Sequence, residues 1–245
     1  MDENRGPMNV ANAFRWLSET SRYDGPNGID TRTIQHLGIS AYVLILASLI
    51  AIPIGLAIGH TNRGGRVVAL AGGLRALPTL GLITLVALNV GIGLRAPVVA
   101  LVVLAVPSIL AGAYAGVQSI DRRTVDAARA IGMSEWQILR KVEIPLGRLL
   151  LLGGLRSASL QVIATATLAD YVGGGGLGRF IFLGLKTNDY PQMLAGSILV
   201  IGLAILSELV FATIHRLTRV RGLVDTPNPR NNRLPGREPG ERNTL

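Results

Sequence analysis

Five long apolar runs, separated by short polar segments, set the pattern of this chain. Each run is 21 to 27 residues long. As a helix, such a run spans roughly 31 to 40 Å, which exceeds the bilayer's hydrocarbon core of about 30 Å. The runs cover residues 38–59, 67–93, 97–117, 147–169 and 192–215. The pattern therefore predicts an all-α membrane protein with about five transmembrane helices.

Positive side chains are distributed unevenly among the segments between these runs. If the N-terminus is outside, the inside segments carry 15 Lys and Arg against 7 Asp and Glu, whereas the outside segments carry seven of each sign. Cytoplasmic loops are enriched in Lys and Arg, so we expect a multi-pass protein of the cell (inner) membrane with its N-terminus outside and its C-terminus in the cytoplasm. The first 35 residues contain no apolar h-region, and we expect no cleavable secretory signal.

Composition excludes several classes of function. The net charge of +9 could suggest nucleic acid, but the positive residues lie between apolar runs and aromatic residues make up only 4%, so no nucleic-acid partner is expected. The chain has no cysteine, and its three histidines are scattered, so no metal site is expected. There is no G-x-x-x-x-G-K-[ST] motif. We therefore expect a protein that is not an enzyme and holds no cofactor, with any ATP and Mg²⁺ bound on a partner chain.

The chain divides into three parts by composition. Residues 1–35 are predicted to form an extracytoplasmic segment whose short helix, around residues 10–20, lies on the outer surface through Phe14, Trp16 and Leu17. Residues 36–217 form the transmembrane domain. Residues 218–245 are basic and rich in Pro, Asn and Gly, which predicts a disordered cytoplasmic tail; weak binding to lipid headgroups is the alternative.

The inside loop, residues 118–148, is too charged to span a membrane and too regular for a linker. Apolar positions recur at helical spacing on both sides of Gly132. Ser134 and Gln137 have the spacing of a capping box, and Pro145 suits the first turn of the next span. The loop is therefore predicted to form two short helices, hinged between Gly132 and Met133, on the inner membrane face.

Small and charged side chains in this loop suit a docking surface. Ala127 and Ala128 allow another backbone to approach closely, Gly132 permits a tight bend, and Asp126 can form ion pairs across a contact. The alternative is a loop that only completes the membrane edge.

Two stretches of the loop, DAARAIG at 126–132 and VEIP at 142–145, resemble the EAA loop of ATP-binding-cassette (ABC) importer permeases. That pattern is Glu-Ala-Ala, three residues, Gly, nine residues and Ile-x-Leu-Pro, and every spacing is kept, although Asp126 replaces the usual Glu. The resemblance implies a type I ABC importer permease fold, with this loop as the coupling helix seated on a cytoplasmic ABC ATPase dimer. The implied ATPase-coupling residues are Asp126, Ala127, Ala128, Gly132, Trp136 and Pro145.

Further stretches, at 50–55, 74–85 and 155–200, resemble the permeases of osmoprotectant importers, which carry glycine betaine, choline and carnitine. The likeness covers about residues 38–217. It implies a second permease copy or a sister permease as dimer partner, and an extracytoplasmic substrate-binding protein that delivers the solute near residues 170–190. The same machine could carry another solute, such as an amino acid or a related betaine. An ion-driven secondary transporter and a membrane enzyme are the alternatives from other classes.

Several glycines suggest local structure. Residues 173–178 formally match G-x-G-x-x-G, but no strand is expected before them, so a tight turn or re-entrant segment at the outer mouth, in reach of a delivery protein, is the better interpretation. Gly55 with Gly59, and Gly112 with Gly116, form small-xxx-small pairs that favour close helix packing.

Prolines and polar residues inside the spans are candidates for the translocation path. Pro53, Pro78 and Pro107 are expected to interrupt their helices. The spans contain few aromatic residues, so high-affinity recognition of a quaternary ammonium solute is expected on the separate binding protein. For the polar residues, a local bond to the helix backbone is the alternative. The candidates are Pro78, Thr79, Asn89, Gln161, Thr165 and Thr167.

Three ionisable residues lie within spans at similar depth from the inner side: Arg75, Arg156 and Glu208. A lone charge at membrane depth is costly, so pairing is expected. We expect Glu208 to pair with Arg156 or Arg75 and to brace the inner gate. Snorkelling of each side chain to the interface is the alternative.

Overall fold

Helices carry most of the described part of the chain, residues 10–218 of the computed structural model, and no strand occurs there. The expected tail beyond residue 218 lies outside this range. Shorter helical turns are η1 (Thr20–Arg22), η2 (Leu74–Ala76), η3 (Leu139–Glu143) and η4 (Ala166–Val172). The α-helices are α1 (Val10–Ser18), α2 (Ile29–Thr61), α3 (Gly65–Gly73), α4 (Thr79–Val90), α5 (Arg95–Gln118), α6 (Arg122–Ala130), α7 (Glu135–Ile138), α8 (Ile144–Thr165), α9 (Gly178–Thr187) and α10 (Tyr190–Thr218).

Four helices of the described residues are long and apolar enough to cross a membrane: α2, α5, the continuous helix Glu135–Val172, and α10. A fifth span is broken, because Gly65–Ala76 and Thr79–Val90 meet at an angle of 91°. The bend lies at Pro78, whose preceding residue Leu77 is extended, with ψ of 133°. Proline disfavours helical backbone in the residue before it. About five spans are thus confirmed, and the second is bent at the expected proline.

The other two prolines do not interrupt their helices, and that expectation was wrong. α2 continues through Pro53 and α5 continues through Pro107. A proline removes one backbone hydrogen bond, and within a packed bundle the neighbouring helices can maintain the helix despite that loss.

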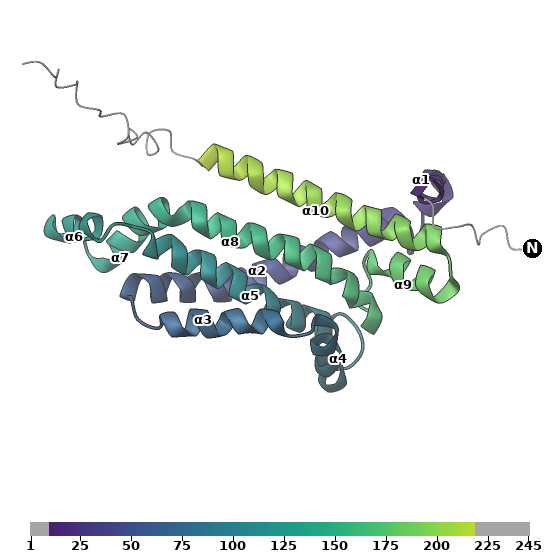
Figure 1. Cartoon of the computed structure of the whole chain (residues 1–245), viewed down its shortest axis with the longest axis horizontal. Coiled ribbons are helices and arrows are strands. Elements are labelled where there is room, and N and C mark those ends of the chain that lie inside the picture. The colour runs from purple at the N-terminus through teal and green to yellow at the C-terminus, as the bar shows by residue number, and fades with distance from the viewer. Residues whose placement is uncertain (1–9, 219–245) are drawn as a thin grey trace, which may run out of the picture.

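The centre of the bundle is formed by α2, α5 and α8, which lie side by side with α5 in the middle (Figure 1). Glycines make both contacts close. A Cβ on Gly55 of α2 would lie 2.8 Å from the Leu110 carbonyl oxygen of α5, and a Cβ on Gly112 of α5 would lie 2.7 Å from the Gly154 Cα of α8. The predicted role of the small-residue pairs in helix packing is confirmed.

The N-terminal helix α1 packs against α10 at the end of the bundle that also holds α9 (Figure 1), called here the α1–α9 end. Trp16 is 5% exposed, and its ring meets that of Phe180 edge-on at 5.5 Å. Phe14 is exposed, as expected, but Trp16 packs into protein rather than onto the outer surface. Helix α2 begins at Ile29, so the boundary expected after residue 35 falls inside a helix.

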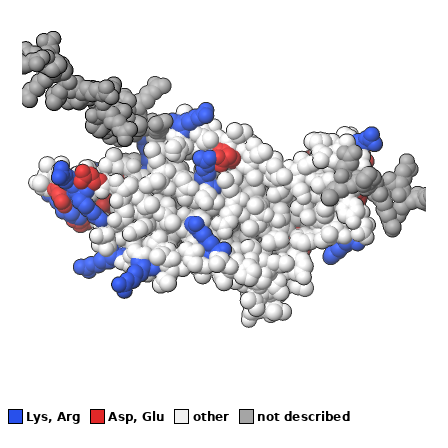
Figure 2. All heavy atoms as spheres, in the orientation of Figure 1, with Lys and Arg blue, Asp and Glu red and all other residues white. Residues whose placement is uncertain are grey.

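Charged side chains gather at the opposite end of the bundle, formed by α6 and α7 and called the α6–α7 end, while most of the body in view is uncharged (Figure 2). Along the body, large apolar side chains of α2, α3, α4 and α10 are exposed. In water such a surface would be unfavourable, whereas in a bilayer it faces acyl chains. The three segments expected on the inner side, around residues 60–66, 118–148 and 216, all lie at the α6–α7 end.

Candidate functional site

The loop predicted to dock a partner forms a folded unit, residues 121–143, called here the docking element. The Asp121 side chain caps α6 by accepting a hydrogen bond from the backbone N–H of Arg123 at 2.9 Å. The chain then turns at Gly132, whose φ of +84° lies in the left-handed region. Ser134 and Gln137 form the capping box that begins α7. The expected first short helix, the bend after it and the capped start of a second helix are confirmed.

One face of the docking element is buried and the other is open. Val125 of α6 and Ile138 of α7 pack together in a small apolar cluster. Ile131 and Trp136 point away from that cluster and are 78% and 66% exposed. Exposed large apolar side chains on an otherwise charged surface are typical of an interaction site.

The six predicted coupling residues fall on different parts of this element. Ala128 is buried and helps to hold α6 against α7. The others are exposed: Asp126, Ala127, Gly132 and Trp136 on the docking element itself, and Pro145 in the first turn of α8. Four of the six residues are therefore exposed on the docking element.

The predicted span start at residue 147 implied that α7 ends before the next span. The structure shows that it does not end there. It continues through a π-helical turn, Leu139–Glu143, directly into α8. π-Turns inside α-helices occur frequently at functional sites. Because the helix is continuous, a force on α7 acts directly on α8.

Ion pairs connect the two helices of the docking element. The Arg129 guanidinium donates to both carboxylate oxygens of Glu135, at 2.7 and 3.0 Å, and to Asp126 at 3.1 Å. These contacts, led by the hydrogen bonds with Glu135, raise the pKa of Arg129 above its usual value. Arg129 therefore remains charged, and the Asp126 carboxylate is held on the exposed surface of α6.

A contact that sequence analysis missed joins this element to α2. The His60 ring, near the end of α2, places Nδ1 2.6 Å from Glu143 Oε2 and Nε2 3.1 Å from Glu135 Oε2. The residues are far apart in the chain, so no local spacing predicts the contact. The available signal was Glu143 itself, a charged residue next to the start of an apolar span, where a buried carboxylate needs a partner.

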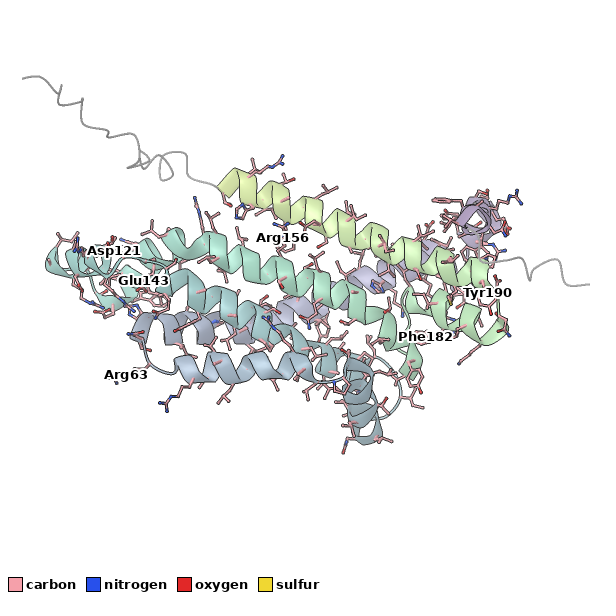
Figure 3. All side chains as sticks on the ribbon, viewed as in Figure 1. Arg63, Asp121, Glu143, Arg156, Phe182 and Tyr190 are labelled. Atoms are coloured by element: carbon pink, nitrogen blue, oxygen red, sulfur yellow. The ribbon has the colours of Figure 1, made fainter. Side chains whose placement is uncertain are left out.

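Of the three charged residues expected within the spans, Arg156 and Glu208 form an ion pair. Arg156 donates through Nε to Glu208 Oε2 at 2.8 Å, and through a second nitrogen to the other carboxylate oxygen. Figure 3 shows Arg156 midway along the bundle, between α8 and α10. Arg75 lies exposed on η2 and forms no ion pair with any residue in the range 10–218. Of the two partners left open for Glu208, the structure selects Arg156.

The candidate path residues do not converge on one cavity. Pro78 and Thr79 lie at the bend between α3 and α4. The Asn89 amide donates to the Leu85 carbonyl of its own helix at 2.8 Å.

The remaining candidates lie along α8 and η4. Thr165 and Thr167 donate to helix carbonyls three or four residues back. Gln161 instead reaches α5, where its amide contacts the Leu104 carbonyl and the Ser108 hydroxyl. Asn89, Thr165 and Thr167 thus form the local bonds to the helix backbone that were the alternative interpretation. A role for the candidates in the translocation path stays a prediction.

The glycine run at residues 173–178 forms a tight turn, as predicted. Gly173, Gly175 and Gly176 have φ between +78° and +83°. The turn wraps around two side chains of α2: Gly176 N–H donates to Gln35 Oε1 at 3.0 Å, and His36 Nδ1 accepts from the N–H of Leu177 at 3.4 Å. No strand precedes the turn in the described part of the chain, which excludes the dinucleotide-binding arrangement there.

Comparisons with known proteins agree with this architecture. Residues 51–220 match the family described as binding-protein-dependent transport system inner membrane component. The chain is 33% identical to the glycine betaine/carnitine/choline transport system permease protein OpuCB of Bacillus subtilis (strain 168), over 78% of this chain and 89% of that protein. It is also 33% identical to the carnitine transport permease protein OpuCD of Listeria monocytogenes serotype 1/2a (strain 10403S), over 74% of this chain and 82% of that protein.

Among solved structures, a chain of the inward-facing MetNI methionine ABC transporter superposes with a TM-score of 0.67 at 24% identity. The match covers 76% of this chain and 94% of that chain, and it shows that the two share a fold. The bent second span, the docking element and the family match together show that this chain belongs to the binding-protein-dependent transport system inner membrane components, the permease subunits of ABC importers.

Proposed function

We propose that this chain is the permease subunit of an ATP-driven importer of osmoprotectants, and that the docking element seats on a cytoplasmic ABC ATPase dimer. The observation that carries the proposal is the open face of that element, where Ile131 and Trp136 are exposed beside Asp126 and Ala127. ATP-driven closure of the ATPase pair would move α6 and α7, and the continuous helix into α8 would carry that movement into the membrane.

Quaternary ammonium compounds are the proposed solutes. The relatives named above are permeases for glycine betaine, carnitine and choline. Aromatic residues within the expected spans are few, namely Tyr42, Tyr114 and Phe211. Because a quaternary ammonium group is best recognised by an aromatic cage, selection is assigned to an external binding protein, and this subunit supplies a path of low affinity.

The proposed orientation places the α6–α7 end in the cytoplasm and the α1–α9 end outside. The excess of Lys and Arg in the segments at the α6–α7 end supports it. At the α1–α9 end, a hollow of about 290 Å³ is lined by apolar residues such as Trp16 and Phe180 and by polar ones such as Arg22 and Asp24. The binding protein would approach this end, near the turn at residues 173–178.

A second permease copy, or a sister permease, is proposed to cover the bent pair α3–α4. Leu70 of α3 and Leu85 and Leu88 of α4 are among the most exposed apolar side chains of the described residues. Because the chain contains no cysteine, one cysteine introduced in place of Leu88 can report contact. Oxidative cross-linking should give a dimer through this site, and a cysteine in place of Ile205 on α10 serves as control.

The Arg156–Glu208 pair is proposed to brace the inner gate by holding α10 against α8. A lone charge at membrane depth costs about 2.5–3.5 kcal/mol on insertion scales, so reversing Glu208 to Arg should reduce the amount of folded protein. Adding Arg156→Glu should restore it, together with uptake. Equal tolerance of both single reversals would contradict the pairing.

The docking proposal is tested by purifying the chain from its own host with the subunits that accompany it. Gly132→Trp places a large ring where a Cβ meets no atom within 4 Å, so the ring clashes only with a docked partner. Gly132→Ala has the same backbone strain without the bulk and is the matched control. We expect the ATPase to be lost from Gly132→Trp and retained by Gly132→Ala. Retention of the ATPase by Gly132→Trp would overturn the docking proposal.

The solute proposal needs a separate measurement. Proteoliposomes holding the purified complex and its binding protein should take up glycine betaine only when ATP is enclosed. Methionine is the comparison solute, and ATP-dependent uptake of methionine without glycine betaine would overturn the proposed substrate class.

A further inference from the structure

The end of α2 is joined to the docking element by one side chain. Within residues 10–218, every hydrogen bond or ion pair between α2 and residues 120–143 involves His60. Its ring is largely enclosed, with 14% of the side chain exposed. Both ring nitrogens lie opposite carboxylate oxygens, at 2.6 Å from Glu143 and 3.1 Å from Glu135.

The two carboxylates lie at different points of the one continuous helix that runs from α7 into α8. Glu143 is 1% exposed and closes the π-turn immediately before α8, whereas Glu135 begins α7 on the open side of the docking element. Figure 3 shows Glu143 at the α6–α7 end of the bundle. A buried carboxylate requires a hydrogen-bonded partner, and His60 provides it. The ring thus links the end of α2 to both the exposed start and the buried π-turn of that helix.

The connection continues to the predicted partner surface. Glu135 is bound by Arg129 through two hydrogen bonds, and Arg129 also holds Asp126. An uninterrupted series of charge-assisted contacts therefore runs from exposed Asp126 through Arg129 and Glu135 to His60. Networks of hydrogen bonds and ion pairs are one means by which energetic coupling passes between distant parts of a protein.

On the membrane side, α2 is well placed to pass on a movement at His60. Immediately before the histidine, Gly59 packs so closely on α5 that a Cβ would lie 2.7 Å from the Val117 side chain. Gly55 makes a similar contact one turn further along. A displacement of the end of α2 is therefore carried into the α2–α5 pair.

We propose that His60 is a positioning residue that transmits movement of the docking element to α2, so that both α2 and α8 follow the ATPase. The inference rests on the proposed function, because it assumes that an ATPase moves α6 and α7. It adds a second route into the membrane, parallel to the continuous α7–α8 helix, and it assigns that route to a single side chain.

The test uses the complete transporter, purified from its own host and reconstituted with its binding protein. Three quantities are measured: the ATPase retained on the permease, the rate of ATP hydrolysis, and the glycine betaine imported per ATP. His60→Gln leaves one amide to serve two carboxylates. His60→Arg supplies a cation with several donors. Gln118→Ala is the control, because Gln118 ties Gly59 and Asn62 to α5 without touching the docking element.

We expect His60→Gln to retain the ATPase but to import about fivefold less glycine betaine per ATP, which matches the size of coupling changes seen when one residue of a network is altered. His60→Arg should recover most of the loss, and Gln118→Ala should resemble the unmodified chain. Glu135→Ala removes the exposed contact of His60 and leaves the contact between His60 and Glu143 in place. It should lower import per ATP in the same way, even if His60→Gln folds poorly.

Each outcome has a distinct meaning. Unchanged import per ATP in both His60→Gln and Glu135→Ala would overturn this inference alone. Failure of His60→Arg to recover coupling, with thermal stability lowered equally in all His60 variants, would assign the residue a structural role and also overturn it. Absence of an ATPase from the unmodified purified chain would overturn the proposed function, and the inference with it.

Discussion

The two histidines of α2 lie at opposite ends of one helix and are held in opposite ways. At the α1–α9 end, His36 is fully buried and bonds only to backbone: Nε2 lies 2.9 Å from the Ile163 carbonyl, and Nδ1 accepts from the N–H of Leu177. At the α6–α7 end, His60 lies between the carboxylates of Glu135 and Glu143. The same residue type therefore bonds only to backbone in one place and only to carboxylates in the other.

The difference extends to the surrounding structure. The α1–α9 end is held by close backbone packing around a glycine turn. The α6–α7 end is held by ion pairs around a short helix pair with an open face. Ion pairs can exchange partners at modest cost, whereas interlocked backbone cannot move without unpacking. We infer that the α1–α9 end acts as the fixed frame and the α6–α7 end as the moving part.

The largest effect is expected at the fixed end. A Cβ on Gly178 would lie 1.8 Å from the Thr167 carbonyl oxygen, which is backbone and cannot yield. Gly178→Val should therefore destabilise the fold by roughly 3 kcal/mol or more, and little monodisperse protein should survive size-exclusion chromatography in detergent. Gly202→Val on α10, where a Cβ meets nothing within 4 Å, is the control. A normal yield of Gly178→Val would remove the distinction between a rigid and a mobile end.

The next effect concerns the buried pair at the moving end. His60→Leu leaves the carboxylate of Glu143 buried without its partner, which costs about 3–5 kcal/mol. Adding Glu143→Met removes the stranded charge, and an apolar pair of similar volume is often as stable as a buried ion pair. We therefore expect the thermal midpoint to fall in His60→Leu and to recover in the double variant, although import per ATP stays low. No recovery would show that Glu143 does not depend on His60.

Much of this architecture could be predicted because it follows from local physical constraints. The spans follow from apolar length, the bend from Pro78, and the turn before α7 from the capping box of Ser134 and Gln137. The small-residue pairs gave the α2–α5 and α5–α8 contacts because only glycine permits such close approach.

The features that could not be predicted depend on three-dimensional neighbours. Whether Pro53 breaks α2 is decided by packing rather than by the proline itself. Trp16 was placed on the surface because nothing local shows that α9 and α10 cover it. The partner of Glu143 lies on another helix, and a histidine at the end of a span gives no sign of which carboxylates it will meet.

A smaller effect is expected from removing the histidine of the fixed end. His36→Leu leaves the Leu177 N–H and the Ile163 carbonyl without the side-chain partner they have in the structure. An unsatisfied buried backbone group costs about 1–3 kcal/mol, so the thermal midpoint should fall. Because both partners of His36 are backbone groups, no second side-chain replacement should restore the thermal midpoint. This differs from His60→Leu, where Glu143→Met should restore it. The protein that remains folded should keep its ATPase. Full rescue by a second substitution would contradict the backbone role of His36.

The smallest effect comes from a matched pair of glycines that differ only in their surroundings. Gly132 and Gly176 have nearly the same φ, +84° and +83°. Replacing either by Ala therefore costs about 1–2 kcal/mol from the left-handed backbone alone. A Cβ on Gly132 meets open space, but one on Gly176 lies 3.1 Å from His36 Nδ1. Thermal midpoints should thus fall further for Gly176→Ala than for Gly132→Ala, because only the former disturbs packed neighbours. Equal losses would mean that backbone strain dominates at both ends and that the fixed end is no more tightly packed than the moving one.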